Sequence, residues 1–237
     1  MQPRLTFRQE LKFYVNKHQY YMMKKKLQHV MKADDHAGEN GEYHIRSLYF
    51  DDFQNKALNE KLAGVKNRHK YRVRMYNFDD SFIQMEKKIK RDLYIAKQKS
   101  SVSRFEVEQL VRGSDDVFDR AEDSLLQEVS GQLKNQLLRP KVIVDYVREA
   151  YTARTGNVRI TFDKDLKTGL NQINPFNPDM TMIPVLDEPV YILEIKFDQY
   201  LPAYIRCALQ IEGLQRQSAS KYVISRKLTK SSSWEDQ

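Results

Sequence analysis

Strict alternation of polar and apolar residues is the main pattern along this chain. In residues 7–15 one side carries Arg8, Glu10 and Lys12, while the other side carries the apolar residues Phe7, Leu11, Phe13 and Val15. A period of two is typical of a β-strand with one buried face. Further strands are predicted over residues 43–51, 68–76, 82–91, 142–151, 158–163 and 190–198, with a hairpin turn at residues 77–81.

Helical spacing of apolar residues occupies the longer segments between these strands. Residues 17–33 and 121–138 each place apolar side chains on one helical face. Ser103 and Glu106 form a capping box that begins a helix ending near Gly113. The remaining predictions are helices over 56–62, 204–212 and 218–228, a loop over 34–41, an irregular connection over 171–189 and a frayed tail over 229–237. Since no low-complexity linker interrupts the chain, we expect one domain over residues 1–237 with a core from about 7 to 228.

A charged face recurs on nearly every predicted strand. Its members are Arg8, Glu10, Lys12, Arg72, Arg74, Glu86, Lys88, Arg159, Thr161, Asp163, Glu194 and Lys196. One explanation is an open sheet with a charged solvent side. The other is a closed sheet whose charged face lines a tunnel and whose apolar outer face is covered by helices. The mixture of acids and bases and the amount of amphipathic helix favour the tunnel. The predicted fold class is therefore α+β, an antiparallel β-barrel tunnel with helices packed outside.

Composition narrows the class of protein. The chain has 237 residues, 41% of them hydrophobic, which is too many for an intrinsically disordered chain. Its one cysteine, Cys207, excludes an internal disulfide framework. The polar start of the sequence does not fit a signal peptide, and no run of eighteen apolar residues could span a membrane. We expect a globular protein of the cytoplasm.

The net charge of +8 is concentrated in one part of the sequence. Residues 66–99 contain eleven Lys or Arg and four acidic residues. This excess favours an anionic partner, which could be nucleic acid, a membrane surface or a phosphorylated small molecule. Nucleic acid is disfavoured because the aromatic residues of these strands lie mostly opposite the charges, where they could not stack on bases beside a phosphate track.

Converging lysine and arginine side chains bind phosphate through charge-assisted hydrogen bonds. Carboxylates among them have two explanations, which the sequence leaves open. Either they hold a hard cation such as Mg²⁺, which takes a few carboxylate oxygens and completes its shell with phosphate oxygens, or they pair with Lys12, Lys88 and Lys196. The candidate metal ligands are Glu10, Glu86, Glu194 and Asp163. No P-loop motif, metal-ligand spacing of histidines or Ser-His-Asp arrangement offers another route.

An ordered set of short motifs resembles the VTC domain, the catalytic domain of the vacuolar transporter chaperone polyphosphate polymerase, in its stand-alone prokaryotic form. The motifs are R-x-E-x-K at 8–12, S-L-Y-F-D at 47–51, Y-R-V-R-M-Y at 71–76, M-E-K-K at 85–88, R-P at 139–140, Y-x-R at 146–148, V-R-I-T-x-D at 158–163, L-E-I-K at 193–196 and S-K-Y at 220–222. The resemblance extends from about residue 7 to 228. It implies the CYTH-like tunnel fold of the triphosphate tunnel metalloenzymes.

The resemblance also implies roles for individual residues. Residues expected to act on the reacting phosphates are Lys12, Arg72, Arg74, Lys88, Arg148 and Arg159. Further phosphate-binding residues are Arg8, Lys196, Lys221 and a lysine after the M-E-K-K strand, either Lys97 or Lys99, of which Lys99 fits slightly better. Glu194 is the expected metal ligand, with Mn²⁺ or Mg²⁺ as the cofactor.

The implied activity is ATP-dependent polyphosphate synthesis, with ATP, triphosphate and polyphosphate as partners and no specific nucleic acid. A tunnel triphosphatase that uses the same residues and a water nucleophile is the alternative, and a non-catalytic polyphosphate-binding module is a third. The phosphate-sensing domain and membrane segment of the eukaryotic polymerases are not found in this sequence. Coupled transport is therefore not expected, while association with a separate membrane protein stays open.

Overall fold

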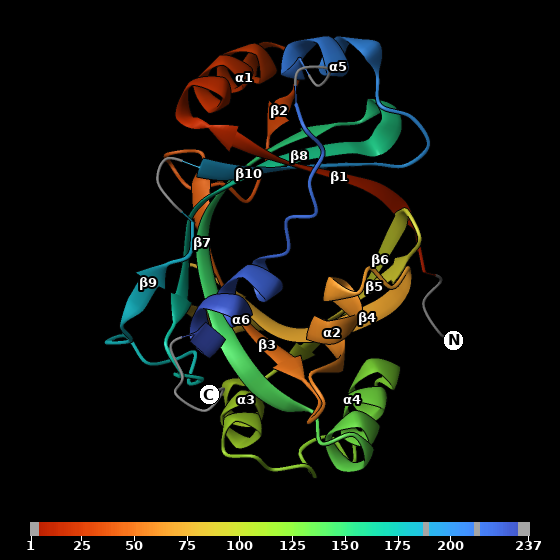
Figure 1. Ribbon diagram of the computed structural model, residues 1–237, viewed down its shortest axis with the longest axis vertical. Helices are drawn as coiled ribbons and strands as arrows, with labels where there is room; N and C mark the ends of the chain where they lie inside the picture. Colours follow the sequence, from red (N-terminus) through yellow and green to blue (C-terminus); the bar gives the residue numbers. More distant parts are fainter. Residues whose placement is uncertain (1–4, 187–189, 211–213, 232–237) are drawn as a thin grey trace.

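A ring of antiparallel strands forms the centre of the protein in the computed structural model, which describes residues 5–186, 190–210 and 214–231 (Figure 1). The sheet order is β2-β7-β3-β4-β5-β6-β1-β10-β8-β9, and an additional pairing of β7 with β8 closes the ring. The strands of the ring are β1 (Arg8–Asn16), β3 (Glu42–Asp51), β4 (Asn67–Tyr76), β5 (Asp79–Arg91), β6 (Tyr94–Val102), β7 (Arg139–Ala153), β8 (Val158–Gly169) and β10 (Val190–Phe197). Two short strands, β2 (Lys32–Ala33) and β9 (Met182–Pro184), extend it. The predicted α+β tunnel is confirmed.

The outer face of the ring is largely apolar, and helices cover it in two places. Helices α3 (Arg104–Val111) and α4 (Ser124–Asn135) pack on one side, where Val107 and Val129 are fully buried. Helices α1 (Lys17–Val30) and α5 (Ala203–Leu209) pack on the other side, where Ile160 and Ile195 are fully buried. Each such side chain contributes about 1.5–3 kcal/mol to the free energy of unfolding when it is buried. The two apolar clusters between strands and helices therefore stabilise the packing of the helices on the outer face.

Two helices lie on the inner side of the ring. Helix α6 (Lys221–Ser231) crosses the opening in Figure 1, next to α2 (Lys56–Leu62). Tyr222 of α6 belongs to an apolar cluster with Ile45 and Val144, whose side chains face inward. The prediction of helices packed outside is therefore confirmed for α1, α3, α4 and α5 and wrong for α2 and α6. The apolar side of α6 covers uncharged inward residues of β3 and β7, among them Ile45 and Val144.

Element boundaries differ from the predictions where strand pairing competes with helical spacing. Helix α1 ends at Val30 because residues 32–33 pair with β7. Helix α4 begins only at Ser124, since the Asp123 carboxylate accepts hydrogen bonds from two backbone amides of its first turn. Strand β6 is absent from the predictions. Helix α6 continues to Ser231, so the predicted frayed tail is wrong over residues 229–231. Residues 232–237, 187–189 and 211–213, on which parts of the predictions fall, lie outside the described residues.

Candidate functional site

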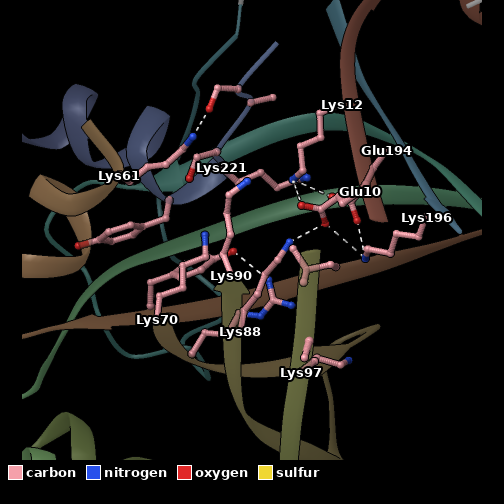
Figure 2. Close-up of a pocket in the computed structure, with 18 of the residues that line it drawn as sticks. Glu10, Lys12, Lys61, Lys70, Lys88, Lys90, Lys97, Glu194, Lys196 and Lys221 are labelled. Atoms are coloured by element: carbon pink, nitrogen blue, oxygen red, sulfur yellow. Dashed lines mark hydrogen bonds and ion pairs between the residues drawn. The ribbon is translucent and has the colours of Figure 1, made fainter. Parts of the chain in front are cut away.

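The ring encloses a cavity of about 740 Å³ whose lining is dominated by positive charge (Figure 2). The lysines and arginines among its described lining residues are Arg8, Lys12, Lys61, Arg68, Lys70, Arg72, Arg74, Lys88, Lys90, Lys97, Arg148, Arg159, Lys196, Arg216 and Lys221. The carboxylates in this lining are Glu10 and Glu194. Since strand residues two apart point to the same side, the alternating pattern of the sequence turns nearly every charged face inward.

Glu10 and Glu194 form the centre of a charge cluster at one side of the cavity. The strand register places Lys12 opposite Glu194 and Glu10 opposite Lys196. Lys12 Nζ lies 2.7 Å from Glu194 Oε2, and Lys196 Nζ lies 2.5 Å from Glu194 Oε1. Lys88 reaches across from β5, with Nζ 2.6 Å from Glu10 Oε1. Figure 2 shows the three lysines converging on the two carboxylates.

The charges of this cluster stabilise one another. Burial and the neighbouring Glu194 raise the pKa of Glu10, but Lys12, Lys88 and Lys196 outweigh them and lower it to about 2. Burial likewise opposes the ionised form of Glu194, and the same lysines hold its pKa well below the usual range. For Lys88 the balance is the reverse, because burial lowers its pKa to about 8 despite the attraction of Glu10. Both carboxylates are therefore ionised at neutral pH.

Asp163 holds two further bases in place. Arg148 makes a bidentate contact with it, Nε to Oδ1 at 2.6 Å and Nη2 to Oδ2 at 2.8 Å. Lys221, at the start of α6, forms an ion pair with the same carboxylate. Burial raises the pKa of Asp163, and the two bases lower it far more. The Asp163 side chain is fully buried behind these bases.

Glu86 plays the same part on β5. Its carboxylate receives Arg72 Nη2 at 2.6 Å and Lys97 Nζ at 2.7 Å, and Arg74 Nη1 lies 3.9 Å away. The Glu86 side chain is fully buried, while the three cations face the cavity. Arg72 Nη1 also donates to the Tyr49 hydroxyl at 3.0 Å. Burial raises the pKa of Tyr49, but Arg72 and other cations outweigh it and lower that pKa to about 7.

The remaining predicted bases have individual partners. Arg74 Nη2 donates to the Tyr146 hydroxyl at 2.8 Å. Arg159 pairs with Asp34 and donates to the Tyr43 hydroxyl at 2.9 Å. Arg8, the first residue of β1, also lines the cavity, and its Nε lies 2.9 Å from Asp198 Oδ1.

The structure separates the two candidate lysines of β6. Lys97 lines the cavity and contacts Glu86, whereas Lys99 is not among the lining residues. The preference for Lys99 is therefore corrected to Lys97. Both residues alternate onto the same face of β6, so the spacing alone could not distinguish them.

The four predicted metal ligands differ in how well they could hold a cation. Glu10 and Glu194 face the cavity and are ionised, so they offer the hard oxygen donors that Mn²⁺ or Mg²⁺ would use together with phosphate oxygens. Glu86 and Asp163 are fully buried and are not among the lining residues. Lysines contact both oxygens of Glu194 as well, so a cation there would have to displace Lys12 or Lys196. Among the described residues, no group of three or more His, Cys, Asp or Glu side chains could hold a metal by itself. A cation here would depend on bound phosphate for most of its shell.

Five lining cations were not among the predicted site residues. Arg68, Lys70 and Lys90 continue the alternation of Arg72 and Lys88, so the strand pattern could have identified them. Lys61 comes from α2 and Arg216 from the segment before α6, for which no sequence pattern indicates the cavity. Within the described ranges, no helix is both long enough and apolar enough to cross a membrane.

Comparison with known proteins supports the fold. A protein from Hippeastrum, provisionally assigned as an adenylyl cyclase and described as having a dominant triphosphatase activity, matches with a TM-score of 0.54 and 12% identity over 93% of this chain and 95% of that chain. A provisionally assigned adenylate cyclase from Bacillus halodurans matches with a TM-score of 0.51 and 12% identity, over 91% of this chain and 95% of that chain. At this identity the similarity shows the fold alone.

A comparison with curated proteins gives no match. The family model of the VTC domain, in contrast, matches residues 7–230, which is nearly the whole chain. The match spans every strand of the ring and the cations of its cavity. The resemblance recognised in the motifs is confirmed, and the chain belongs to the VTC domain family.

Proposed function

We propose that this protein is a polyphosphate polymerase that transfers the γ-phosphate of ATP to a growing polyphosphate chain inside the cavity. The observation that carries the proposal is the enclosed set of inward bases held in place by buried carboxylates. Arg72 and Arg148 have two nitrogen atoms each on a carboxylate, which fixes their guanidinium groups before any ligand binds. Such preorganisation is what phosphoryl transfer requires of a protein.

In the proposed reaction, an oxygen of the terminal phosphate of the chain attacks the γ-phosphorus of ATP. The bond from that phosphorus to the β–γ bridging oxygen breaks, and ADP leaves with that oxygen. Arg72, Arg74 and Arg148 neutralise the equatorial oxygens, and Lys12 and Lys88 orient the reacting groups. Arg159, Lys97, Lys196, Lys221 and Arg8 add phosphate contacts around them. Glu194, with Glu10, would hold Mn²⁺ or Mg²⁺, which would help to neutralise the charge of the reacting phosphates.

The setting of this reaction follows from its substrates. ATP and Mg²⁺ are cytoplasmic, so we place the protein in the cytoplasm, either free or associated with a separate membrane protein. Nucleic acid is not its specific ligand in this proposal, because the cavity rings of Tyr49, Tyr146 and Tyr222 are almost fully buried and offer no free face on which a base could stack.

A triphosphatase is the second candidate. The similarity to the Hippeastrum protein, described as having a dominant triphosphatase activity, favours it. The same bases would bind triphosphate, and water would replace the chain end as the nucleophile. A non-catalytic polyphosphate-binding module is the third candidate, for which the cavity bases would only have to bind phosphate.

Incubation with γ-labelled ATP and Mn²⁺ or Mg²⁺ distinguishes the three functions. Acid-insoluble labelled polymer supports the polymerase, release of free phosphate supports the hydrolase, and saturable polyphosphate binding without turnover supports the module. Arg74→Gln should abolish turnover, whereas Lys25→Gln, on the exposed side of α1, should not change it. Free phosphate without polymer, abolished by Arg74→Gln, would contradict the polymerase.

A further inference from the structure

Like charges stand directly opposite each other on part of the β4–β5 pairing. The register places Arg68 opposite Lys90 and Lys70 opposite Lys88. The next pair on the same face, Arg72 opposite Glu86, has opposite charges. Like charges at directly opposed positions destabilise an antiparallel pair, so this arrangement works against folding unless something compensates it.

We call Lys61, Arg68, Lys70 and Lys90 the mouth cluster. All four line the cavity and are partly buried. Among the described residues none of the four forms an ion pair. Lys61 contacts the Ser218 hydroxyl, Arg68 contacts a backbone oxygen, and Lys70 Nζ lies over the Tyr49 ring, 5.1 Å from its centroid. Every predicted catalytic base, in contrast, has a carboxylate within ion-pair distance, and all of them except Arg159 share that carboxylate with another base.

The absence of carboxylates affects the titration of the cluster. Burial, followed by the nearby Arg68 and Lys90, lowers the pKa of Lys61 to about 8. Burial also lowers the pKa of Lys70, to about 7, and repulsion from Lys88 and Arg72 adds to it. The fold therefore gathers four basic side chains, of which Lys70 is only partly protonated at neutral pH, in one place without a described carboxylate beside them. Four partly buried cations inside a cavity are unlike a solvated basic surface, where water and salt would screen them.

We propose that the mouth cluster is a second anion-binding subsite, which takes phosphoryl groups of a polyphosphate chain beyond those held at the reacting bases. The inference deepens the proposed function and rests on it in one respect, namely that the cavity accepts phosphate. A linear chain suits the geometry because the two sets of bases line one continuous cavity. In Figure 2, Lys61 and Lys70 lie on the opposite side of the view from Glu194 and Lys196. Triphosphate bound at the reacting bases would leave the mouth cluster uncovered, whereas a longer chain would neutralise it.

The test compares ligands of two lengths on matched variants. Lys61→Gln/Lys90→Gln removes two charges of the mouth cluster without touching any carboxylate pair. Lys17→Gln/Lys25→Gln removes two exposed charges from α1, outside the ring, and serves as the control. Calorimetry with triphosphate and with long-chain polyphosphate, in the same buffer and salt, gives two affinities for each protein.

We expect the mouth variant to bind long-chain polyphosphate at least about tenfold more weakly, since each lost charge-assisted contact is worth a factor of this order. Its affinity for triphosphate should stay within about threefold of the wild type, because a triphosphate held at the reacting bases makes no direct contact with Lys61 or Lys90 and loses only their weaker attraction at longer range. The control should change neither affinity beyond that range. The preference for the longer chain is thus reduced only in the mouth variant.

Two results would overturn the inference. One is an unchanged ratio of the two affinities in the mouth variant, and the other is an equal loss for both ligands. The polymerase proposal can fail separately. If the wild-type protein binds polyphosphate but forms no polymer, the ratio of the two affinities can still be measured and still tests the mouth cluster. If the wild type binds neither ligand, both proposals fall.

Discussion

The reacting bases and the mouth cluster are built from the same residue types on the same strands, yet the fold treats their charge differently. Around Glu10, Glu86, Asp163 and Glu194 each inward cation has a carboxylate within ion-pair distance or shares one. In the mouth cluster no described carboxylate is so placed. The neutralised part is fixed in position by the protein, while the charge of the mouth cluster is left for a ligand to neutralise. A protein that acts on long polyanions needs both kinds of cation. The neutralised bases keep the geometry of the reaction, and the unpaired cations contribute binding free energy when the ligand neutralises them.

A second contrast lies along β7. Its inward residues Val142 and Val144 pack under α6 in an apolar cluster, whereas Tyr146 and Arg148 face the cavity. The inward face of β7 thus belongs to the apolar core at one end of the strand and to the cavity lining at the other. Helix α6 covers the apolar part and supplies Lys221 to the charged part, which ties the position of a base to the packing of a helix.

The largest expected effect comes from removing a neutralising carboxylate. Glu86→Gln leaves Arg72, Arg74 and Lys97 close together without a counterion. Breaking a buried pair in this way destabilises a protein by about 3–5 kcal/mol. Urea unfolding at neutral pH measures it, with Lys99→Gln as a control on the same sheet. A change in the free energy of unfolding below about 1 kcal/mol would contradict the structural role given to Glu86.

The next effect concerns turnover. If Glu194 holds the catalytic cation, Glu194→Gln should lower the rate by about a hundredfold or more, the scale of losing one preorganised charge contact. The titration of activity with Mn²⁺ should shift at the same time. If Glu194 serves only Lys12 and Lys196, the rate should fall modestly and the Mn²⁺ titration should be unchanged. Glu10→Gln is the matched comparison, because Glu10 shares the same lysines.

Acid should weaken the neutralised part of the cavity first. The pKa of Glu10 is about 2 in the folded protein, against 4.5 for an unperturbed glutamate, so its contribution is complete above pH 4.5 and is lost as the pH falls through about 2. The unfolded chain binds the proton first, and the free energy of unfolding therefore decreases on acidification. The loss due to Glu10 cannot exceed about 3.5 kcal/mol, given about 1.4 kcal/mol for each pH unit.

Urea unfolding at about pH 5 and about pH 3 tests this, with the wild type compared with Glu10→Gln. The variant should lose less stability between the two conditions than the wild type does. Equal losses would show that Glu10 is not stabilised by Lys12, Lys88 and Lys196 in the folded state.

The smallest expected effect is a gain in stability. In the absence of ligand, Lys61→Gln/Lys90→Gln should raise the free energy of unfolding by about 0.2–1 kcal/mol, because it relieves repulsion between like charges. The same urea experiment without phosphate in the buffer measures it. A loss of stability in this variant would mean that the two lysines support the fold, and the contrast with the neutralised part would then disappear.

Much of this arrangement could be predicted from local pattern. The alternation in residues 7–15 and 68–76 identified strands with one charged side, and the mixture of acids and bases favoured a closed ring over an open sheet. The ordered motifs identified the VTC domain. The pattern could not place Lys61, which comes from a helix, and it missed β6, whose residues do not alternate as clearly as those of β4.

The sequence by itself determined which side chains share a face, because the period of two is a property of each strand and needs no partner. It also determined the family. Only the tertiary structure decided which charges meet. Lys12 stands opposite Glu194 and Arg68 opposite Lys90 because of the register between strands, and α6 lies inside the ring because of the apolar residues it covers there. Register and closure depend on contacts between residues far apart in the chain, so one strand's pattern cannot specify whether an inward lysine will face a carboxylate or another cation.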